Sequence, residues 1–300
     1  MSLPIHFSCI ITCYNRENEI KRAIQSILDQ SYQHFEIIIV DDASIDKSIA
    51  VIATIDDPRI RVIKHEINRG QNAALNSGVK ACKFDYLAFL DSDDIWLPNY
   101  LQEMQRAYIN NPNSAFVYCS LVNGPLWTLE GENKYAEVLN QGYLSSMISI
   151  TAKKEAVLGI NSFDVRYSIC QDDDFCFRLA KRYSFSVVKK HLAEVHGATN
   201  SMTKNMVKLA QGWDFLFNDY KKDIISLCGA KSFSRHKLNL TLQYFHCNRI
   251  FSGLKCYING VCVFFKPSEN KFSFSSSEFI TINKKILRLF ASKIKQAIIN

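Results

Sequence analysis

Tyr86-Leu87-Ala88-Phe89-Leu90-Asp91-Ser92-Asp93-Asp94 joins an apolar run to a cluster of carboxylates. The apolar part has the length and the aromatic content of a buried β-strand. Three carboxylates follow within four residues, and like charges this close are costly unless a positive group lies among them. Mg²⁺ and Mn²⁺ favour oxygen ligands and commonly join a protein carboxylate to a substrate diphosphate. These residues alone also fit a solvated acidic turn in which an aspartate caps the next helix.

Apolar runs earlier in the chain end in the same way. The run 7–12 leads into Thr12-Cys13-Tyr14, and the run 35–40 leads into Asp41-Asp42. Asn15 precedes apolar residues at helical spacing, so we expect it to cap a helix there. Up to Asp91 the pattern predicts strands at 7–12, 35–40, 61–65 and 86–90 and helices at 20–28, 48–55 and within 68–78.

Strands that alternate with helices predict right-handed βαβ units and a mainly parallel sheet. Ligands of such sheets bind beyond the carboxyl ends of the strands. We therefore expect the three polar clusters at the strand ends to meet in one crevice, and not to be three separate solvated turns. After Pro98 the pattern predicts helices at 99–108, 153–158 and from 171 onward, strands at 115–119, 144–151 and 185–188, and a loop at 121–143.

Bulk properties narrow the classes of protein. The net charge of +7 favours anionic partners such as nucleotides or an acidic membrane surface. Basic residues do not interleave with aromatic ones as a nucleic-acid patch requires, so we expect no nucleic-acid partner. No apolar run reaches the roughly 18 residues that span a bilayer, and the first residues do not have the pattern of a signal peptide. Ten cysteines without metal-ligand spacing predict reduced thiols in a cytoplasmic protein.

The motifs together resemble those of the inverting family 2 glycosyltransferases. That family has the GT-A fold, an α/β domain with a Rossmann-like, mainly parallel central sheet flanked by helices. Each motif alone is weak, but their order and spacing are specific, and the resemblance covers roughly residues 5–203. The matching segments are Ile11–Arg16, Ile39–Ser44, Asn68–Gly78, Leu90–Asp94 and Gln171–Asp174.

The resemblance implies that the nucleotide of a sugar donor lies at the first strand ends. Thr12 and Tyr14 would cradle the nucleobase, and the Tyr14 ring can stack on it. Asp42 would accept a hydrogen bond from a base N–H, while Asp41 would support the turn or reach the ribose. Arg69 would pair with phosphate, although an exposed arginine on a turn fits equally well. The expected nucleotide-binding residues are Thr12, Tyr14, Asn15, Asp41, Asp42, Arg69, Asp91 and Ser92.

The same resemblance implies Mn²⁺ or Mg²⁺ as a cofactor. Asp93 is the expected ligand of a cation that bridges the diphosphate, and Asp91 would contact the ribose or a metal-bound water. His196 resembles a histidine that reaches the metal or the phosphates in many relatives, although a lone histidine in a loop also fits a surface position. The cation would neutralise the charge that develops on the leaving nucleoside diphosphate.

Asp172 matches the position of the family's catalytic base, which takes a proton from the acceptor hydroxyl as the oxygen attacks the anomeric carbon. One displacement with one base predicts inversion. The family pattern usually begins with Glu-Asp at this point, whereas this chain has Gln171-Asp172. The missing acidic neighbour should make Asp172 easier to ionise. The alternative is that residues 172–174 only supply negative charge at a helix N-terminus.

We expect residues 1–203 to form the GT-A domain, with a nucleotide-binding half at 1–95 and an acceptor half at 96–203. Residues 204–300 would be a helical C-terminal extension. Its last segment combines an apolar stripe with flanking lysines and an arginine. Such a basic amphipathic helix can make peripheral contact with an anionic membrane, or it can pack on its own core or on a second subunit in a homo-oligomer.

The sequence therefore predicts a metal-dependent inverting glycosyltransferase. It would move a sugar from a nucleotide-sugar donor, foremost a UDP-sugar, to a hydroxyl of a glycan or lipid-linked glycan acceptor, in bacterial surface polysaccharide synthesis at the inner face of the cell membrane. One alternative is a sugar nucleotidyltransferase, but such enzymes typically have a Gly-rich N-terminal loop and residues 12–16 contain no glycine. The other is a non-catalytic glycan- or partner-binding module on a degenerate transferase fold, against which the intact Asp93 and Asp172 argue.

Overall fold

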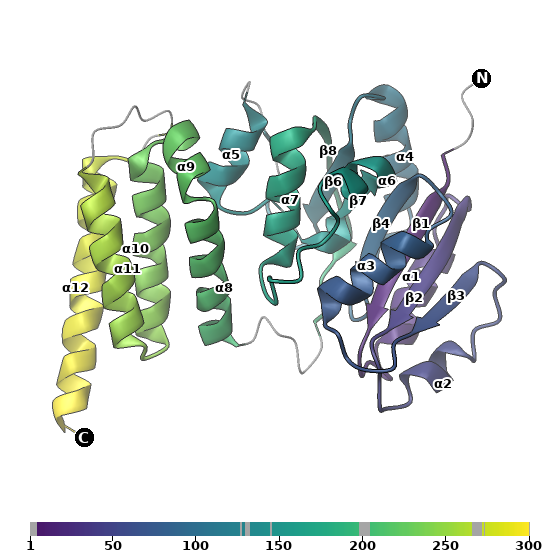
Figure 1. Ribbon diagram of the computed structural model, residues 1–300, viewed down its shortest axis with the longest axis horizontal. Coiled ribbons are helices and arrows are strands. Elements are labelled where there is room, and N and C mark those ends of the chain that lie inside the picture. Colours follow the sequence, from purple (N-terminus) through teal and green to yellow (C-terminus); the bar gives the residue numbers. More distant parts are fainter. Residues whose placement is uncertain are drawn as a thin grey trace. The chain divides into compact units, whose positions relative to one another are not determined.

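The computed structural model describes residues 5–126, 128–129, 133–144, 146–197, 205–265, 272 and 274–299, with side chains of the last helix described up to residue 293. The chain divides into two compact units (Figure 1). One unit comprises Met1–Glu130 and Leu144–Thr199, and the other comprises Gly131–Tyr143 and Asn200–Asn300. Residues 131–143, which the sequence pattern placed in a loop of the acceptor half, are thus grouped with the C-terminal unit.

The first unit is built on one mixed sheet. Its strands are β1 (Phe7–Cys13), β2 (Phe35–Asp41), β3 (Ile60–Lys64), β4 (Tyr86–Asp91), β5 (Ile95–Trp96), β6 (Phe116–Leu121), β7 (Ile150–Lys153) and β8 (Phe185–Glu194). Their spatial order is β3-β2-β1-β4-β7-β6-β8-β5. The first four strands in this order are parallel, as is the β6–β8 pair, whereas β7 and β5 pair antiparallel to their neighbours. The expected mainly parallel α/β sheet is confirmed.

Helices cover both faces of this sheet, as burial of parallel strands requires (Figure 1). Because β1 is buried along its whole length, its alternate side chains meet different helices. Phe7, Cys9 and Ile11 face one cluster, which α1 and α4 complete, and Ile10 faces α3. The helices of this unit are α1 (Ile20–Leu28), α2 (Ser48–Ile52), α3 (Gln71–Ala81), α4 (Tyr100–Asn110), α6 (Lys154–Gly159) and α7 (Gln171–Arg182), with a 3₁₀ turn η1 (Met147–Ser149).

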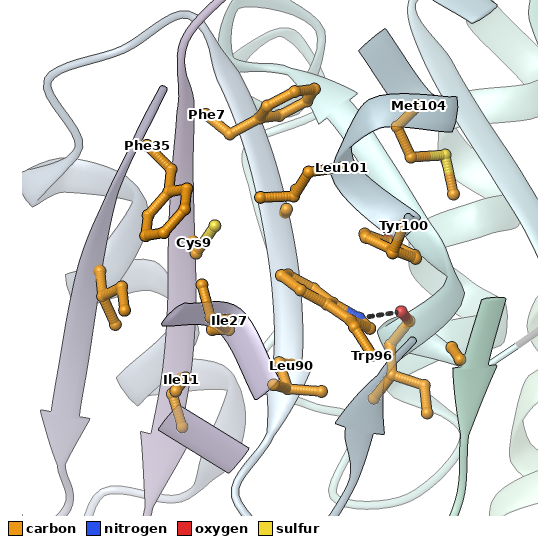
Figure 2. Close-up of a cluster of buried hydrophobic side chains, with 14 of the residues drawn as sticks. Phe7, Cys9, Ile11, Ile27, Phe35, Leu90, Trp96, Tyr100, Leu101 and Met104 are labelled. Atoms are coloured by element: carbon orange, nitrogen blue, oxygen red, sulfur yellow. Dashed lines mark hydrogen bonds between the residues drawn. The ribbon is translucent and has the colours of Figure 1, made fainter. Parts of the chain in front are cut away.

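Trp96 anchors the core on the α1 and α4 side (Figure 2). Its indole stacks on Tyr100 with ring centroids 4.2 Å apart, and its N–H donates to the carbonyl of Ile148 at 2.7 Å. On the opposite face α3 approaches β1 so closely that a Cβ on Gly78 would lie 2.5 Å from Cγ2 of Ile10. Glycine at this position therefore sets how near α3 lies to the sheet.

Three local expectations are wrong. The strand expected at 144–151 begins only at Ile150, because the 3₁₀ turn η1 takes residues 147–149. Asn15 does not cap the first helix, because α1 begins at Ile20 with Glu19 at the cap position and no side-chain cap bond. The loop expected at 121–143 contains the helix α5 (Lys134–Gln141), which the Asn133 side chain caps by accepting from the N–H of Ala136. This helix is short, and tertiary packing within its unit stabilises it more than its own propensity does.

The C-terminal unit is helical, as expected for residues 204–300. Besides α5 it contains α8 (Met206–Asp219), α9 (Lys221–Cys228), α10 (Ala230–His246), α11 (Ile250–Phe264) and α12 (Ser276–Ile299). Helix α10 contributes Leu238 and Phe245 to a cluster that α11 and α12 complete with Phe264 and Ile286. Within the described ranges, no helix is both long enough and apolar enough to cross a membrane.

His236 of α10 is buried within this unit, where it bonds to a backbone carbonyl. Its Nε2–H donates to the carbonyl of Leu139 at 3.0 Å, and its ring stacks on Phe217 with centroids 4.3 Å apart. Burial, together with the adjacent Arg235 and Lys237, lowers the pKa of His236 to about 3. The folded chain therefore holds this imidazole neutral through the mildly acidic range in which an unfolded chain protonates it.

The low pKa predicts an acid-labile C-terminal unit. The contribution of His236 to stability is complete above its unfolded pKa of about 6.5, and it falls by roughly 1.4 kcal/mol per pH unit as the pH drops from there toward the folded pKa. We expect His236→Gln to flatten the fall in unfolding temperature between about pH 7.5 and pH 5. His246→Gln, at an exposed position on the same helix, should keep the wild-type slope. Equal slopes in all three proteins would show that His236 does not cause the acid lability.

Candidate active site

The expected convergence of the strand ends is present in the sheet. Strand β1 lies between β2 and β4, and the direction in which the chain proceeds across the sheet reverses there. Cys13 lies opposite Asp41 on β2, and Thr12 lies opposite Asp91 on β4. The carboxyl ends of the three strands therefore meet at a topological switch point, which is where open α/β sheets bind ligands.

Asp42 closes the loop that leads into α3. Its Oδ1 accepts from the N–H of Arg69 at 2.9 Å and lies 2.7 Å from Nδ1 of His65, and its Oδ2 accepts from the N–H of Gly70 at 2.7 Å. Gly70 adopts φ +85, a conformation that disfavours other residues. The Nε2 of His65 lies 2.9 Å from Oγ of Ser77 on α3. These bonds fix where α3 begins.

Asp41 is buried beside Asp42 but is much less engaged. Its Oδ2 accepts from the N–H of Ser44 at 3.2 Å, while its buried Oδ1 has no hydrogen-bond partner. Asp42 therefore accepts the bonds that support the loop, whereas Asp41 keeps one oxygen available to accept from a ligand. A carboxylate oxygen can accept more than one hydrogen bond, so Asp42 also retains the capacity to accept from a ligand.

Asn15 joins two of the strand-end loops. In a left-handed conformation with φ 52, it donates its N–H to Oγ of Ser44 and accepts from the N–H of Ile45, each at 2.9 Å. Thr12, at the sheet edge, is nearly buried, whereas 43% of Tyr14 is exposed, so its ring is accessible to a ligand. The side chain of Arg69 is exposed, and only its backbone takes part in the bonds of Asp42.

A cluster of carboxylates gathers beyond β4. Burial raises the pKa of Asp91 well above its usual range, and the carboxylates of Asp172, Asp94 and Asp93 raise it further. Burial also raises the pKa of Asp94 to about 6, although Oδ1 of Asp94 accepts from the N–H of His196 at 2.9 Å. Ser92 is buried between these acidic residues in the chain. The structure therefore brings Asp172, distant in the sequence, to the acidic cluster that follows β4.

Asp172 lies in the first turn of α7. Its Oδ2 accepts from the N–H of Met147 at 3.0 Å, and its buried Oδ1 has no partner. Burial raises the pKa of Asp172, partly offset by the Met147 N–H. Asp174 instead forms an ion pair with Arg178 at 2.6 Å, so it stabilises the helix and its surroundings. Of these two carboxylates, Asp172 is the one that offers an unpaired oxygen to a ligand.

Two glutamines connect the acidic cluster to α3 and α7. Gln71 donates from Nε2 to Oδ1 of Asp91 at 2.9 Å, and Gln171 donates from Nε2 to Oε1 of Gln71 at 3.0 Å. Oε1 of Gln171 is buried and has no partner. A glutamate at position 171 could not donate to Gln71 while ionised. The departure from the usual Glu-Asp pair therefore creates a neutral chain of amides that orients Asp91.

The asparagines that follow on α3 hold the loop before α7. Asn72 donates to the carbonyls of Asp164 and Tyr167 at 2.6 and 2.9 Å, and Asn76 exchanges two hydrogen bonds with the backbone of Phe163, both at 2.9 Å. Gln71, Asn72 and Asn76 were not among the residues expected at the site. Their sequence signal was the unusual polarity of a helix facing the sheet. The partners of the two asparagines lie about ninety residues away, so no local pattern identifies them.

The acidic cluster has the chemistry of a site for a divalent cation. The positive charge of Arg16 lowers the pKa of Asp91, but its effect is smaller than that of the neighbouring carboxylates, which raise it. Among the described residues, no three His, Cys, Asp or Glu side chains form a complete set of metal ligands. Asp91 and Asp93 fit a cation that takes its remaining ligands from a diphosphate and water, as Mg²⁺ commonly does. Nε2 of His196 lies 3.2 Å from Oε1 of Glu194 at the end of β8, and the backbone N–H of His196 donates to Asp94.

The carboxyl ends of β1, β2 and β4, with the start of α7, offer three chemical features. They have an accessible aromatic ring at Tyr14, buried acceptors without donors at Asp41 and Asp172, and crowded carboxylates around Asp91. These features suit ligands that bring an aromatic ring, a metal-bound anion and a hydroxyl group to the carboxyl ends of these strands.

Comparisons with known proteins identify a family that the chain resembles. A sequence model of the family described as Glycosyl transferase family 2 matches residues 8–186. An uncharacterized glycosyltransferase of Haemophilus influenzae is 28% identical over 230 residues, which are 72% of this chain and 78% of that one. WfgD of Escherichia coli, described as a UDP-Glc:alpha-D-GlcNAc-diphosphoundecaprenol beta-1,3-glucosyltransferase, is 37% identical over 111 residues, 37% of this chain and 44% of WfgD.

The fold is also shared with a solved structure. The mannosyltransferase PcManGT from Pyrobaculum calidifontis, in complex with GDP-Man and Mn²⁺, superposes with a TM-score of 0.63 over 98% of this chain and 85% of that chain. The two sequences are 13% identical, so this likeness concerns the fold alone.

Asp42 and Asp41 form a matched pair for testing which carboxylate supports the loop. Asp42→Asn places an amide NH₂ against N–H donors, so at least one donor loses its acceptor, at a cost of about 1–3 kcal/mol. Asp41→Asn can keep its bond to Ser44 and should change stability little. Chemical denaturation of the two variants measures the difference. If Asp42→Asn is as stable as the wild type, the loop does not depend on this carboxylate.

Proposed function

Because the chain belongs to glycosyl transferase family 2 and is a glycosyltransferase with the GT-A fold, we propose that it transfers a sugar, with inversion, from a UDP-sugar to a hydroxyl of a lipid-linked glycan. The observation that carries this proposal is the meeting of Asp91, Asp94 and Asp172, with an unpaired buried oxygen on Asp172. The reaction would serve the synthesis of bacterial surface polysaccharide at the inner face of the cell membrane.

The similarity to WfgD favours this donor and acceptor. The name of that protein specifies UDP-Glc as the donor and a diphosphoundecaprenol-linked sugar as the acceptor. The similarity extends over 111 residues, which are 37% of this chain and 44% of WfgD. PcManGT was solved with GDP-Man, so the donor test includes GDP-sugars beside UDP-sugars.

The base and ribose of the donor would lie at the ends of β1 and β2. Tyr14 offers a ring face for stacking, and Thr12 lies near the carboxyl end of β1, opposite Asp91 on β4. Asp41 and Asp42 are the candidate acceptors for a base N–H: Asp41 has an oxygen without a partner, and Asp42 has spare lone pairs. Asn15 would act by holding the two loops together, and Ser92 and Arg69 are further candidates near the ribose and phosphates.

The diphosphate would lie against the acidic cluster, held by Mn²⁺ or Mg²⁺ on Asp93 and Asp91, with His196 as a further candidate. When bound, the cation supplies Lewis-acid stabilisation of the negative charge on the departing nucleoside diphosphate. Asp91 is already oriented by Gln71, so it can adopt a fixed geometry before the ligand arrives. Such preorganisation lowers the cost of binding.

Asp172 would act as the general base. The Met147 N–H holds one of its oxygens, which leaves Oδ1 to accept the proton of the acceptor hydroxyl. As the hydroxyl oxygen forms its bond to the anomeric carbon, the bond to the diphosphate oxygen breaks on the opposite face. A single displacement of this kind inverts the anomeric configuration and leaves no covalent glycosyl-enzyme.

A thermal-shift panel of nucleotide sugars, with and without Mn²⁺, tests the donor half of the proposal. UDP-sugars should raise the unfolding temperature, because a ligand that binds the folded state stabilises it. Mn²⁺ should enlarge the shift in the wild type but not in Asp93→Asn, and EDTA should stop transfer. A response only to GDP-sugars would show that the donor is not a UDP-sugar. Full transfer activity in EDTA would show that transfer does not need a metal. Release of pyrophosphate in place of UDP would instead support a nucleotidyltransferase.

Asp172→Asn tests the base. Because a positioned general base contributes roughly 10²- to 10⁴-fold, the variant should lose transfer by about that factor while its UDP-sugar thermal shift stays near that of the wild type. Its stability should be unchanged or higher, since it removes a carboxylate with a raised pKa. Asp174→Asn is the matched control on the same helix: it loses the Arg178 ion pair and should mainly lose stability. Wild-type turnover in Asp172→Asn would exclude Asp172 as the base.

A further inference from the structure

Helix α11 is apolar on the face that it buries and on the face that it exposes. Gly253, Cys256, Gly260 and Val263 are buried. On the other side a stripe recurs at intervals of four and three residues, and we call it the α11 stripe: Phe251, Lys255, Ile258, Cys262 and Phe265.

The apolar members of the α11 stripe are well exposed. Phe251 is 89% exposed, Ile258 59% and Phe265 72%. A helix that is apolar all round is normally buried on all sides, so a stripe like this one is expected to have a partner. Fifteen residues of helix extend about 22 Å, which is shorter than the hydrocarbon core of a bilayer, so α11 can lie along a bilayer surface but does not span it.

The charge of the protein is concentrated in the same part of the chain. Residues 249–300 contain nine of the 36 lysines and arginines but two of the 29 acidic residues. The first 248 residues therefore hold 27 of each sign, and the last 52 hold the whole net charge of +7. Helix α11 contains no acidic residue, and α12 contains one, Glu278.

Helix α12 places part of this charge beside α11. Its Ile286 belongs to the same hydrophobic cluster as Leu254 and Val261 of α11. The outward residues Lys284, Lys285 and Arg288 are exposed, together with the apolar Leu287. Exposed cations thus accompany exposed apolar side chains on two helices of one cluster.

We propose that the α11 stripe, with the exposed cations of α12, is a docking surface for an anionic lipid bilayer. The apolar side chains would enter the interface between headgroups and acyl chains, while Lys255 would extend its ammonium group toward the headgroups. Each lysine or arginine near an anionic surface strengthens binding about fivefold. A second copy of the chain fits less well, because pairing this surface with itself brings like charges together. The inference does not depend on which sugar or acceptor the enzyme uses.

The exposed thiol within the stripe provides a direct probe. All ten cysteines lie in the described part of the chain, eight of them are buried, Cys247 is half-buried, and Cys262 is exposed. The full-length protein is labelled at Cys262 with an environment-sensitive fluorophore and mixed with vesicles of phosphatidylglycerol or of phosphatidylcholine. A blue shift and co-sedimentation with phosphatidylglycerol alone, both weakened by added salt, are the expected results.

Matched variants separate the apolar and the electrostatic contributions. Phe251→Ser combined with Ile258→Ser, and Lys284→Gln combined with Lys285→Gln, should each lower vesicle binding roughly tenfold or more. The controls are Ile109→Ser, at another exposed apolar position, and Lys21→Gln combined with Lys80→Gln, which should bind as the wild type does. Because the changes are on exposed side chains, the nucleotide-sugar thermal shift should persist in every variant. This separates failure of docking from failure of the proposed enzyme activity.

Three outcomes would overturn the proposal. The first is the absence of binding to phosphatidylglycerol vesicles. The second is binding that the four stripe and α12 substitutions leave unchanged. The third is a fluorophore shift without vesicles that increases with protein concentration and accompanies a dimer in light scattering, because the stripe would then be an interface between copies of this chain.

Discussion

The geometry of the site depends on the hydrogen bonds that the carboxylate of Asp42 accepts. Because these bonds come from the backbone N–H groups of Arg69 and Gly70, they determine where α3 begins. The next residue, Gln71, then reaches Asp91, and Asn72 reaches the loop that precedes α7. One short helix end thus connects the candidate nucleotide-binding loops, the acidic cluster and the candidate base. Gly78 completes this arrangement by allowing α3 to lie directly on β1.

The acidic cluster shows how a site of this kind opposes folding. Asp91, Asp94 and Asp172 have raised pKa values because burial and mutual repulsion disfavour their charged forms. Surrounding contacts must offset that cost, and in this unit the offset comes from a sheet buried on both faces and from Trp96 beneath the adjoining strands. Crowded carboxylates that weaken a fold are expected where binding of a cationic group relieves the repulsion.

The central strands of the sheet could be predicted from the sequence, whereas the polar contacts between distant segments could not. Strands β1, β2 and β4 were predictable because buried parallel strands are continuous apolar runs, and their common edge followed from topology. The carboxylates of Asp91 and Asp172 could be grouped by family resemblance, and the structure brings them together. That Asp42 supports the loop before α3 was not predictable, since it depends on which side chain reaches the backbone of residues 69–70. Nor was α5, whose stability depends on helices from the far end of the chain.

The uneven distribution of charge has a consequence for handling the protein. Without residues 249–300, the remaining chain would carry equal numbers of acidic and basic side chains and would be near its isoelectric point at neutral pH. Molecules in that condition lose the mutual repulsion that keeps a concentrated solution clear. A preparation shortened by proteolysis in the last two helices would therefore precipitate more readily and would leave a cation-exchange column earlier, even if its sheet were intact.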